Sequence, residues 1–296
     1  MATVLVTGAC GDIGRWTVDA LADSHEVIGV DLHRPRRDAI DGVSYQSVDL
    51  TDQGPTLELI ADVQPEVVVH LAAIPGAGIS PAGQTFTQNA ASAYHVLDGA
   101  GRVDATVLWT SSEATYGVTY GDEPRPLEYL PIDEHHPQRP LDGYGLSKVV
   151  GEEIAERTTR RYGVPIVSIQ PTWVQVPGRY ETPPIRESFH LDDATPSGSL
   201  WSYIDVRDVA SFIETAIGAD LEGHKRYILV ADDNYLGIET SKAIEAGWGS
   251  LPEPCDIEGE EAAFTTEKAQ RDLGWQPEHS WRESEQARVD EPGVSG

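Results

Sequence analysis

The chain has 296 residues and carries 49 acidic against 21 basic side chains, a formal net charge of −28. Because nucleic-acid phosphates and anionic lipid headgroups repel such a chain, we expect neither nucleic-acid nor membrane partners. Only four of the basic residues are lysines. This shortage beside the carboxylate excess favours a halophilic protein, working in salt that screens self-repulsion, over an ordinary acidic one.

Two cysteines, Cys10 and Cys255, are too few for a disulfide framework or a thiolate zinc site. The N-terminal apolar run has no basic segment before it, and no apolar stretch of 18 residues follows. The sequence therefore predicts a soluble, cytoplasmic protein without a signal peptide or membrane span.

Short apolar runs alternate with longer amphipathic stretches from the first residues to about residue 170. The runs are nearly continuous in apolar character and are bounded by Gly, Pro or Asp, which is typical of strands buried on both faces. Strands are predicted at residues 3–7, 26–31, 43–48, 67–71, 105–110 and 165–169, and helices at 13–22, 56–62, 85–100 and 144–162. This alternation predicts an α/β fold, a doubly wound parallel sheet of the Rossmann type.

The texture changes after residue 170. Residues 171–200 are rich in Pro, Gly and Ser and are expected to be irregular. A strand leading into a helix is predicted over 203–217, a strand over 227–230 and a helix over 266–273. We therefore divide the chain into an NAD(P)-binding core at 1–170 and a small C-terminal substrate-binding lobe at 171–296. The lobe is interleaved with late core elements at 203–230, and its polar tail, 282–296, is expected to fray.

A glycine-rich loop connects the first predicted strand to the first helix. Gly8 permits the tight turn, Gly11 lets backbone approach a pyrophosphate, and Gly14 lets the helix pack on the strand. The helix N-terminus then offers unpaired N–H groups to phosphate. Such loops also occur as plain connections, but strand, loop and helix agree here, and the pattern predicts dinucleotide binding.

Asp31 strengthens this prediction because it ends the second strand, about 20 residues after the loop, where a carboxylate meets the adenosine ribose. A carboxylate accepts a hydrogen bond from a free 2′-hydroxyl and repels a 2′-phosphate. Arg34, Arg36 and Arg37 follow closely and are either partners for such a phosphate or solvated loop charges. We expect NAD as the cofactor, with NADP tolerated.

Tyr144 and Lys148 are spaced to lie on one face of a helix. A tyrosine is a poor base at neutral pH, and we expect Lys148 together with an oxidised nicotinamide to lower its pKa. Taken alone, the pair is better explained as an exposed Tyr–Lys pair on a helix surface. Ser111 and Ser112 follow the fifth strand, however, where this fold places residues that face a ligand. A hydroxyl there can bind the reacting alcohol or carbonyl.

With these features together, the chain resembles the extended short-chain dehydrogenase/reductase family, nearest to its sugar and uronate 1-dehydrogenases. The resemblance covers nearly the whole chain, including later segments at 203–210 and 273–277. It implies that Tyr144 is the acid/base, that Lys148 orients the ribose and lowers the tyrosine pKa, and that Ser112 aligns the substrate. Beyond the glycines and Asp31, it implies cofactor contacts from Asp12, Ile13, Leu32, Arg34, Asp49, Leu50, Leu71, Ala72, Ala73, Asn89, Ser111 and Pro171.

The lobe bears on the substrate. Nucleotide-sugar enzymes of this family carry a longer segment before residue 203, with basic residues that grip the diphosphate, whereas residues 171–202 are short and acidic on balance. Where the uronate enzymes have an arginine for the sugar carboxylate, this chain has Gln170. We therefore expect oxidation of a free neutral aldose at C1 to its lactone. A nucleotide-sugar 4-epimerase or dehydratase with tightly held NAD is the alternative.

Three more residues are candidate sugar contacts. Trp173 and Trp201 are either stacking surfaces or core filling, and Glu113 is either a hydroxyl ligand or part of the acidic surface. We predict no metal site, since the histidines lack carboxylate or cysteine neighbours at ligand spacing. An insertion at 121–140 is expected to cap the active site or a partner subunit. The family resemblance implies a homodimer formed through the helices near 85–100 and 144–162.

Overall fold

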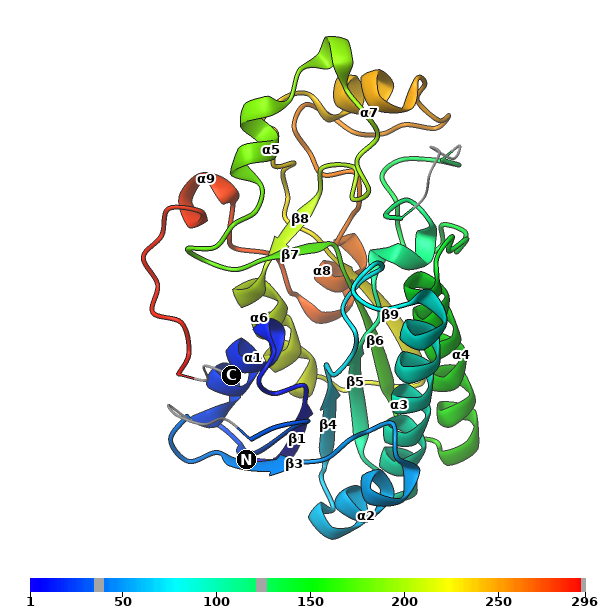
Figure 1. Ribbon diagram of the computed structural model, residues 1–296, viewed down its shortest axis with the longest axis vertical. Helices are drawn as coiled ribbons and strands as arrows, with labels where there is room; N and C mark the ends of the chain where they lie inside the picture. The colour runs from blue at the N-terminus through cyan, green and yellow to red at the C-terminus, as the bar shows by residue number, and fades with distance from the viewer. Residues whose placement is uncertain (35–39, 121–126, 294–296) are drawn as a thin grey trace.

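The computed structural model describes residues 1–34, 40–120 and 127–293. Seven parallel strands form one sheet in the order β3-β2-β1-β4-β5-β6-β9, with helices on both faces (Figure 1). This confirms the predicted doubly wound α/β fold. The strands are β1 (Thr3–Thr7), β2 (Glu26–Asp31), β3 (Ser44–Ser47), β4 (Val67–His70), β5 (Thr106–Thr110), β6 (Ile166–Pro171) and β9 (His224–Leu229).

The central strands are buried on both sides because alternate side chains enter different cores. In β1, Val4 and Val6 belong to one apolar cluster, whereas Leu5 belongs to another. Val67 and Val69 of β4 join the first cluster and Val68 the second. The period of two of a strand therefore explains why these segments show no polar face in the sequence.

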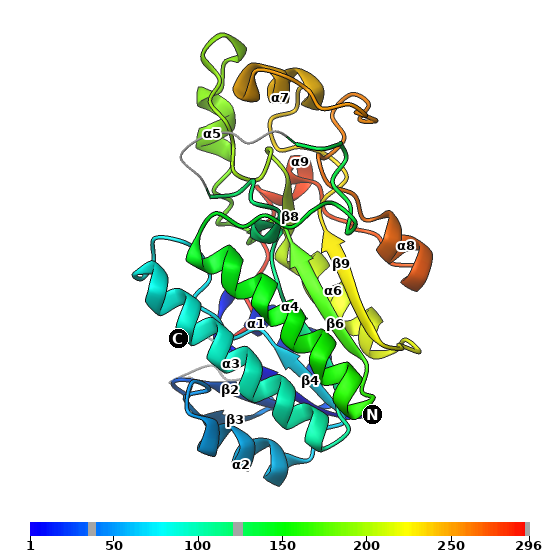
Figure 2. The same cartoon turned by 90° about the vertical axis from the view of Figure 1, so that its right-hand side faces the viewer.

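Two groups of helices cover the sheet. α2, α3 and α4 lie on one face and α1 and α6 on the other (Figures 1 and 2). Their bounds are α1 (Asp12–Ala22), α2 (Gln53–Val63), α3 (Ala82–Arg102), α4 (Gly143–Tyr162) and α6 (Val206–Ile217). Side-chain caps fix several starts: Asp52 accepts from Gly54 N at α2, and Asp142 accepts from Tyr144 N and Gly145 N at α4.

The sheet places a crevice at the ends of β1 and β4. From β1 the chain proceeds to β2 and β3 on one side, and from β4 to β5, β6 and β9 on the other. The connections on the two sides of β1 therefore leave the sheet in opposite directions. In open parallel sheets a ligand binds at this point, beyond the carboxyl ends of the strands.

The lobe beyond the sheet has its own apolar core. β7 (Trp173–Gln175) pairs in parallel with β8 (Tyr203–Asp205), and short helices surround this ribbon. Residues 171–200, expected to be irregular, thus contain β7 and α5. The shorter helical elements are α5 (Pro183–Ser188), α7 (Thr240–Trp248), α8 (Glu267–Leu273), α9 (Trp281–Ser284), and the 3₁₀ turns η1 (Glu113–Tyr116) and η2 (Leu191–Asp193).

Part of the expected insertion belongs to this core. Leu130 and Ile132 are buried in the lobe's apolar cluster, and both bridge to the chain near residues 255–264. Residues 121–126 lie outside the described chain. The segment from 127 onward therefore packs into the lobe core and stabilises it, a role that its polar composition did not indicate.

The C-terminal segment, expected to fray, is largely exposed but makes several specific contacts where the structure describes it. Trp281 donates its indole N–H to Asn234 O at 3.0 Å, and Ser284 is buried. Farther on, the Glu291 carboxylate bonds Arg15 at 2.9 Å and Arg179 at 2.7 Å. Figure 1 shows this segment running from α9 down toward α1. None of the helices described is long and apolar enough to cross a membrane.

Candidate active site

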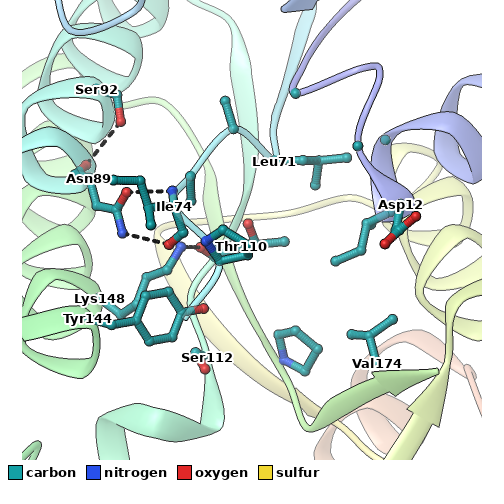
Figure 3. A pocket seen from close by; sticks show the side chains of 18 of the residues that line it. Asp12, Leu71, Ile74, Asn89, Ser92, Thr110, Ser112, Tyr144, Lys148 and Val174 are labelled. Atoms are coloured by element: carbon teal, nitrogen blue, oxygen red, sulfur yellow. Dashed lines mark hydrogen bonds between the residues drawn. The ribbon is translucent and has the colours of Figure 1, made fainter. Parts of the chain in front are cut away.

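A cleft of about 730 Å³ opens at the carboxyl ends of the sheet strands and extends toward the lobe (Figure 3). Segments that follow β1, β2, β4, β5 and β6 line it, together with α4 and residues 119–120 and 199. Among the described residues of its lining, Lys148 is the one Lys, Arg or His, whereas four are acidic: Asp12, Asp31, Asp49 and Glu113.

The glycine loop is built as its pattern predicts. Gly8 has a φ of +69°, and a Cβ there would lie 2.7 Å from Ala72 N. A Cβ on Gly14 would lie 2.0 Å from Gly8 O, so the helix can approach the turn only without a side chain. Gly11, Asp12 and Ile13 also line the cleft. The open backbone at the N-terminus of α1 fits a pyrophosphate, as the prediction of a dinucleotide requires.

Asp31 lies at the end of β2 and lines the same end of the cleft. Its carboxylate accepts from Cys10 N at 3.0 Å and from Leu32 N at 2.7 Å, which fixes its orientation. Leu32 lines the cleft as well, but Arg34 does not. The Arg34 side chain is exposed, and its contact with the cofactor stays a prediction. Arg36 and Arg37 lie outside the described residues.

The other predicted cofactor residues lie at or after the ends of β3, β4, β5 and β6, or on α3. Asp49 accepts from Thr51 N at 2.9 Å and Thr51 Oγ1 at 2.7 Å, and these bonds hold the pKa of its carboxyl below the usual value. Asn89 clamps the turn after β4, since its amide accepts from Ile74 N at 2.8 Å and donates to Ile74 O at 3.1 Å (Figure 3). The remaining predicted residues that line the cleft here are Leu50, Leu71, Ala72, Ala73, Ser111 and Pro171.

Ser112, Tyr144 and Lys148 come together between the nucleotide end and the lobe. The Tyr144 ring and Ser112 lie beside each other, with Lys148 behind them (Figure 3). Lys148 Nζ donates to Thr110 O at 2.7 Å and lies 5.5 Å from the centroid of the Tyr144 ring. Ser112 at the end of β5 and Tyr144 at the start of α4 are 32 residues apart in the chain. The fold thus brings together one cluster of groups that can hold or move a proton.

Burial governs the protonation of this cluster. It lowers the pKa of Lys148 to about 7, against an opposite contribution from Glu152. It raises the pKa of Tyr144 well above the usual value for a phenol, and the hydrogen bond with Ser112 offsets only part of that rise. The expected lowering of the Tyr144 pKa by Lys148 is thus outweighed in the protein alone.

A buried polar network supports Lys148 from behind. Glu152, one turn further along α4, accepts from Ser111 Oγ at 2.5 Å, Gln170 Nε2 at 2.9 Å and Gln138 Nε2 at 2.6 Å. Gln170 also accepts from Tyr116 Oη at 2.8 Å, and its side chain is fully buried. The prediction that Gln170 contacts substrate is wrong here, because both ends of its amide are engaged in the network and it does not line the cleft.

The two candidate tryptophans separate. Trp173 lines the cleft, whereas Trp201 is buried in the lobe core, edge-on to Phe189 at a centroid distance of 5.5 Å. Trp201 is therefore core filling and not a sugar contact. The sequence does not decide between a sugar-stacking surface and core filling, because an aromatic residue in a loop-rich segment has no periodicity that distinguishes a core position from a cleft position.

The lobe end of the cleft contains residues that the sequence did not single out. Thr119, Tyr120 and Ser199 line it together with Glu113. Ser199 Oγ donates to Glu113 Oε1 at 2.8 Å, and Tyr120 packs edge-on against Tyr144 with centroids 6.1 Å apart. Burial raises the pKa of Glu113 to about 8. No local motif marks these residues, since they meet only through packing of the lobe on the sheet.

Three of the histidines considered as metal ligands make contacts within the protein. The His70 ring and the Thr7 hydroxyl lie 2.7 Å apart, and burial lowers the pKa of His70 to about 3. His95 Nδ1 lies 3.0 Å from Leu50 O, and the ring of His136 packs against Tyr129. In the described parts of the chain, no three His, Cys, Asp or Glu side chains are grouped to hold a metal ion.

Fold and site together define a dinucleotide-dependent α/β enzyme with a tyrosine–lysine centre. The model of the NAD dependent epimerase/dehydratase family matches residues 4–231, and the chain belongs to this family. Membership confirms the predicted extended short-chain dehydrogenase/reductase resemblance and the prediction of NAD as cofactor. The chain is accordingly an NAD-dependent enzyme of the sugar dehydrogenase and epimerase type.

Individual relatives differ in their reactions. An L-arabinose 1-dehydrogenase (NAD(P)(+)) from Haloferax volcanii is 28% identical over 255 residues, covering 82% of this chain and 95% of the relative. A uronate dehydrogenase from Pseudomonas syringae pv. tomato is 27% identical over 271 residues, covering 86% and 88%. The solved UDP-glucose 4-epimerase of Thermotoga maritima, with UDP-glucose, has a TM-score of 0.71 at 19% identity and covers 99% and 97%. The last likeness concerns the fold alone.

Proposed function

We propose that the protein is an NAD-dependent dehydrogenase that oxidises a free, neutral aldose at C1 to the lactone, with NADP tolerated. The observation that carries the proposal is the charge of the cleft, whose described lining offers four carboxyl groups and Lys148 as its one cation. A diphosphate or a sugar carboxylate needs positive partners, best supplied by arginine. A neutral sugar needs none.

Two arginines of the segment 171–202, Arg179 and Arg186, support this reading because carboxylates already pair with them. Arg179 bonds Asp12 at 2.8 Å and Glu291 at 2.7 Å. Arg186 bonds Glu285 at 2.7 Å, with its guanidinium stacked 3.8 Å from the Trp281 ring centroid. Neither lines the cleft. A nucleotide sugar would have to break these pairs to obtain a cationic partner.

In the proposed reaction the C1 hydroxyl loses its proton, C1 loses a hydride, and a carbonyl forms at C1. The nicotinamide supplies the hydride acceptor and a positive charge when it is bound. Tyr144 takes the hydroxyl proton, while Ser112 hydrogen-bonds the same oxygen and holds it toward the phenol. Lys148 is placed to hold a ribose hydroxyl and to favour the phenolate, and Thr110 and Glu152 hold the ammonium in position.

A UDP-hexose 4-epimerase is the second candidate, since the same three residues and the same fold serve such enzymes. An epimerase retains its reduced cofactor within each turnover, whereas a dehydrogenase releases it. Absorbance of reduced nicotinamide therefore discriminates between the two. We would assay a panel of free aldoses, uronates and UDP-hexoses with NAD and NADP in concentrated KCl, because we also propose that the charge of −28 reflects salt adaptation.

Reduction of NAD by free neutral aldoses, and not by uronates, is the expected result. Interconversion of UDP-hexoses without net reduction would establish the epimerase instead. No reduction with any free sugar would overturn the proposed function.

We further propose a homodimer through α3 and α4, whose exposed apolar side chains include Tyr94 and Leu146, and sedimentation would measure its mass.

A further inference from the structure

Two buried oxygens in the wall of the cleft lack hydrogen-bond partners within the described chain. They are Glu113 Oε2 and Thr119 Oγ1. A buried polar atom left unpaired destabilises the protein, so such atoms in a binding cleft mark places where a ligand completes the bonding. Glu113 begins η1, just after β5, and Thr119 follows η1, where it touches the lobe segment at Gly198.

Glu113 is held in a fixed orientation. It directly follows Ser112, only 3% of its surface is exposed, and Ser199 Oγ donates to its Oε1. The titratable groups that face it are the phenols of Tyr120, Tyr144 and Tyr235, and no cation compensates its charge. The carboxyl is therefore protonated near neutral pH. Since Oε1 accepts from Ser199, the proton belongs on Oε2, which becomes a donor without an acceptor.

Thr119 is held close to the same place by packing. A Cβ on Gly198 would lie 2.2 Å from Thr119 O, so the lobe segment that carries Ser199 touches the backbone that carries Thr119. This close approach brings a chain segment following η1 and one preceding β8 against each other. The pair Glu113–Ser199 and the Thr119 hydroxyl thus form one polar wall of the cleft.

We propose that Glu113 Oε2 and Thr119 Oγ1 form a subsite for hydroxyl groups of the sugar beyond C1. The subsite rests on the proposed function and makes it more specific. A sugar hydroxyl is both donor and acceptor, so it can satisfy either atom without bringing charge into the cleft. A deoxy sugar that lacks this hydroxyl leaves the buried atoms unpaired and is rejected.

The test measures binding of free aldoses to the complex of the enzyme with NADH, by quenching of nicotinamide fluorescence, so that no turnover is needed. We expect Glu113→Ala and Thr119→Val each to raise the aldose Kd about 10-fold, as loss of a buried hydrogen bond does. Glu113→Gln keeps one acceptor and one donor, so its aldose Kd should stay within about threefold of the wild-type value. The NADH Kd stays unchanged in all three, and KM rises while kcat holds.

Thr85→Val is the matched control, because Thr85 Oγ1 is also buried and unpaired within the described chain but lies on α3 outside the cleft. It should leave the aldose Kd unchanged. Monodeoxy aldoses complete the design: one of them should bind wild type weakly and lose no further affinity in Thr119→Val or Glu113→Ala.

Aldose binding equal to wild type in both Glu113→Ala and Thr119→Val would overturn the subsite and leave the proposed function standing. Absence of aldose binding to wild type would overturn both. A raised NADH Kd in the variants would assign these residues to folding of the cleft and would likewise overturn the subsite.

Discussion

The two ends of the cleft are built in different ways. At the nucleotide end, the cleft is lined by the stretch from β1 through the end of β2 and by residues 48–51 after β3, and the candidate binding groups are backbone N–H groups and the Asp31 carboxylate. At the end where we propose that the sugar binds, the cleft is lined by η1, residues 119–120 and Ser199, and the candidate binding groups are buried side-chain oxygens. We therefore expect the dinucleotide, the constant part of the ligand set, to be bound mainly by backbone groups, and the sugar, the variable part, by side chains.

Charge divides the ends further. The N-terminus of α1 supplies positive potential for a pyrophosphate without any basic side chain. The sugar end has no such source, and burial keeps Glu113 neutral there. Lys148 lies between the two ends as the one cationic side chain among the described lining residues. A substrate that brings its own charge would meet compensation only at the reaction centre.

Tyr144→Phe separates the reaction centre from both ends and should have the largest effect. Removing the phenolic hydroxyl removes the proton acceptor, so kcat should fall about 10³-fold, within the range for a lost general base. The NADH Kd should stay within about twofold, because the ring and the rest of the cleft remain.

The matched control for this change is Tyr162→Phe. It removes a hydroxyl at the other end of α4, where Tyr162 Oη donates to Asp98 at 3.0 Å, and it should leave kcat unaltered. Loss of turnover together with NADH binding in Tyr144→Phe would assign Tyr144 to folding of the cleft and not to proton transfer.

The sequence predicted the nucleotide end well because its signals are local. Gly8, Gly14 and Asp31 belong to one strand–helix–strand unit whose geometry allows few residue types at each position. Arg34 is harder to place from the sequence, because charge near Asp31 does not determine whether a side chain lines the cleft, and Arg34 does not line it here.

The sugar end was predicted poorly because its contacts cross long stretches of chain. Glu113 and Ser199 are 86 residues apart, and no periodicity announces that they meet. Trp201 and Gln170 have side chains of the kind that often contact sugars, but Trp201 is buried in the lobe core and Gln170 in the network around Glu152. Packing of the lobe on the sheet, which the sequence does not reveal locally, decided each of these positions.

Glu113→Gln tests whether the sugar end carries a neutral acid. Burial raises the pKa of Glu113 to about 8 from 4.5, so the folded protein binds one proton more than the unfolded chain between these values. The stability that this carboxyl contributes is present below pH 4.5 and is lost as the pH rises toward 8. Against the amide variant, wild type should lose about 1.4 kcal/mol of unfolding free energy per pH unit in this window.

Urea unfolding of both proteins at pH 5 to 9 in the same salt measures this difference. Lys148, whose pKa is lowered, contributes in the opposite direction, but it is present in both proteins and cancels. Parallel stability curves would mean that Glu113 is ionised throughout, and the contrast between the two ends would lose its electrostatic part.

Asp31→Ala tests the nucleotide end and should have the smallest of these effects. The carboxylate is fixed by Cys10 N and Leu32 N and is placed for a ribose 2′-hydroxyl, so its loss should raise the NAD Kd about 10-fold, as for a charge-assisted hydrogen bond. NADP, whose 2′-phosphate the carboxylate repels, should lose less affinity or gain some. Titration of both cofactors by fluorescence gives the ratio. An equal loss of affinity for both cofactors would remove Asp31 from the ribose site and leave cofactor choice to other residues. A loss confined to NAD would show that one carboxylate at the end of β2 sets the preference. The proposed sugar end would differ, because several oxygens from distant segments bind the ligand there.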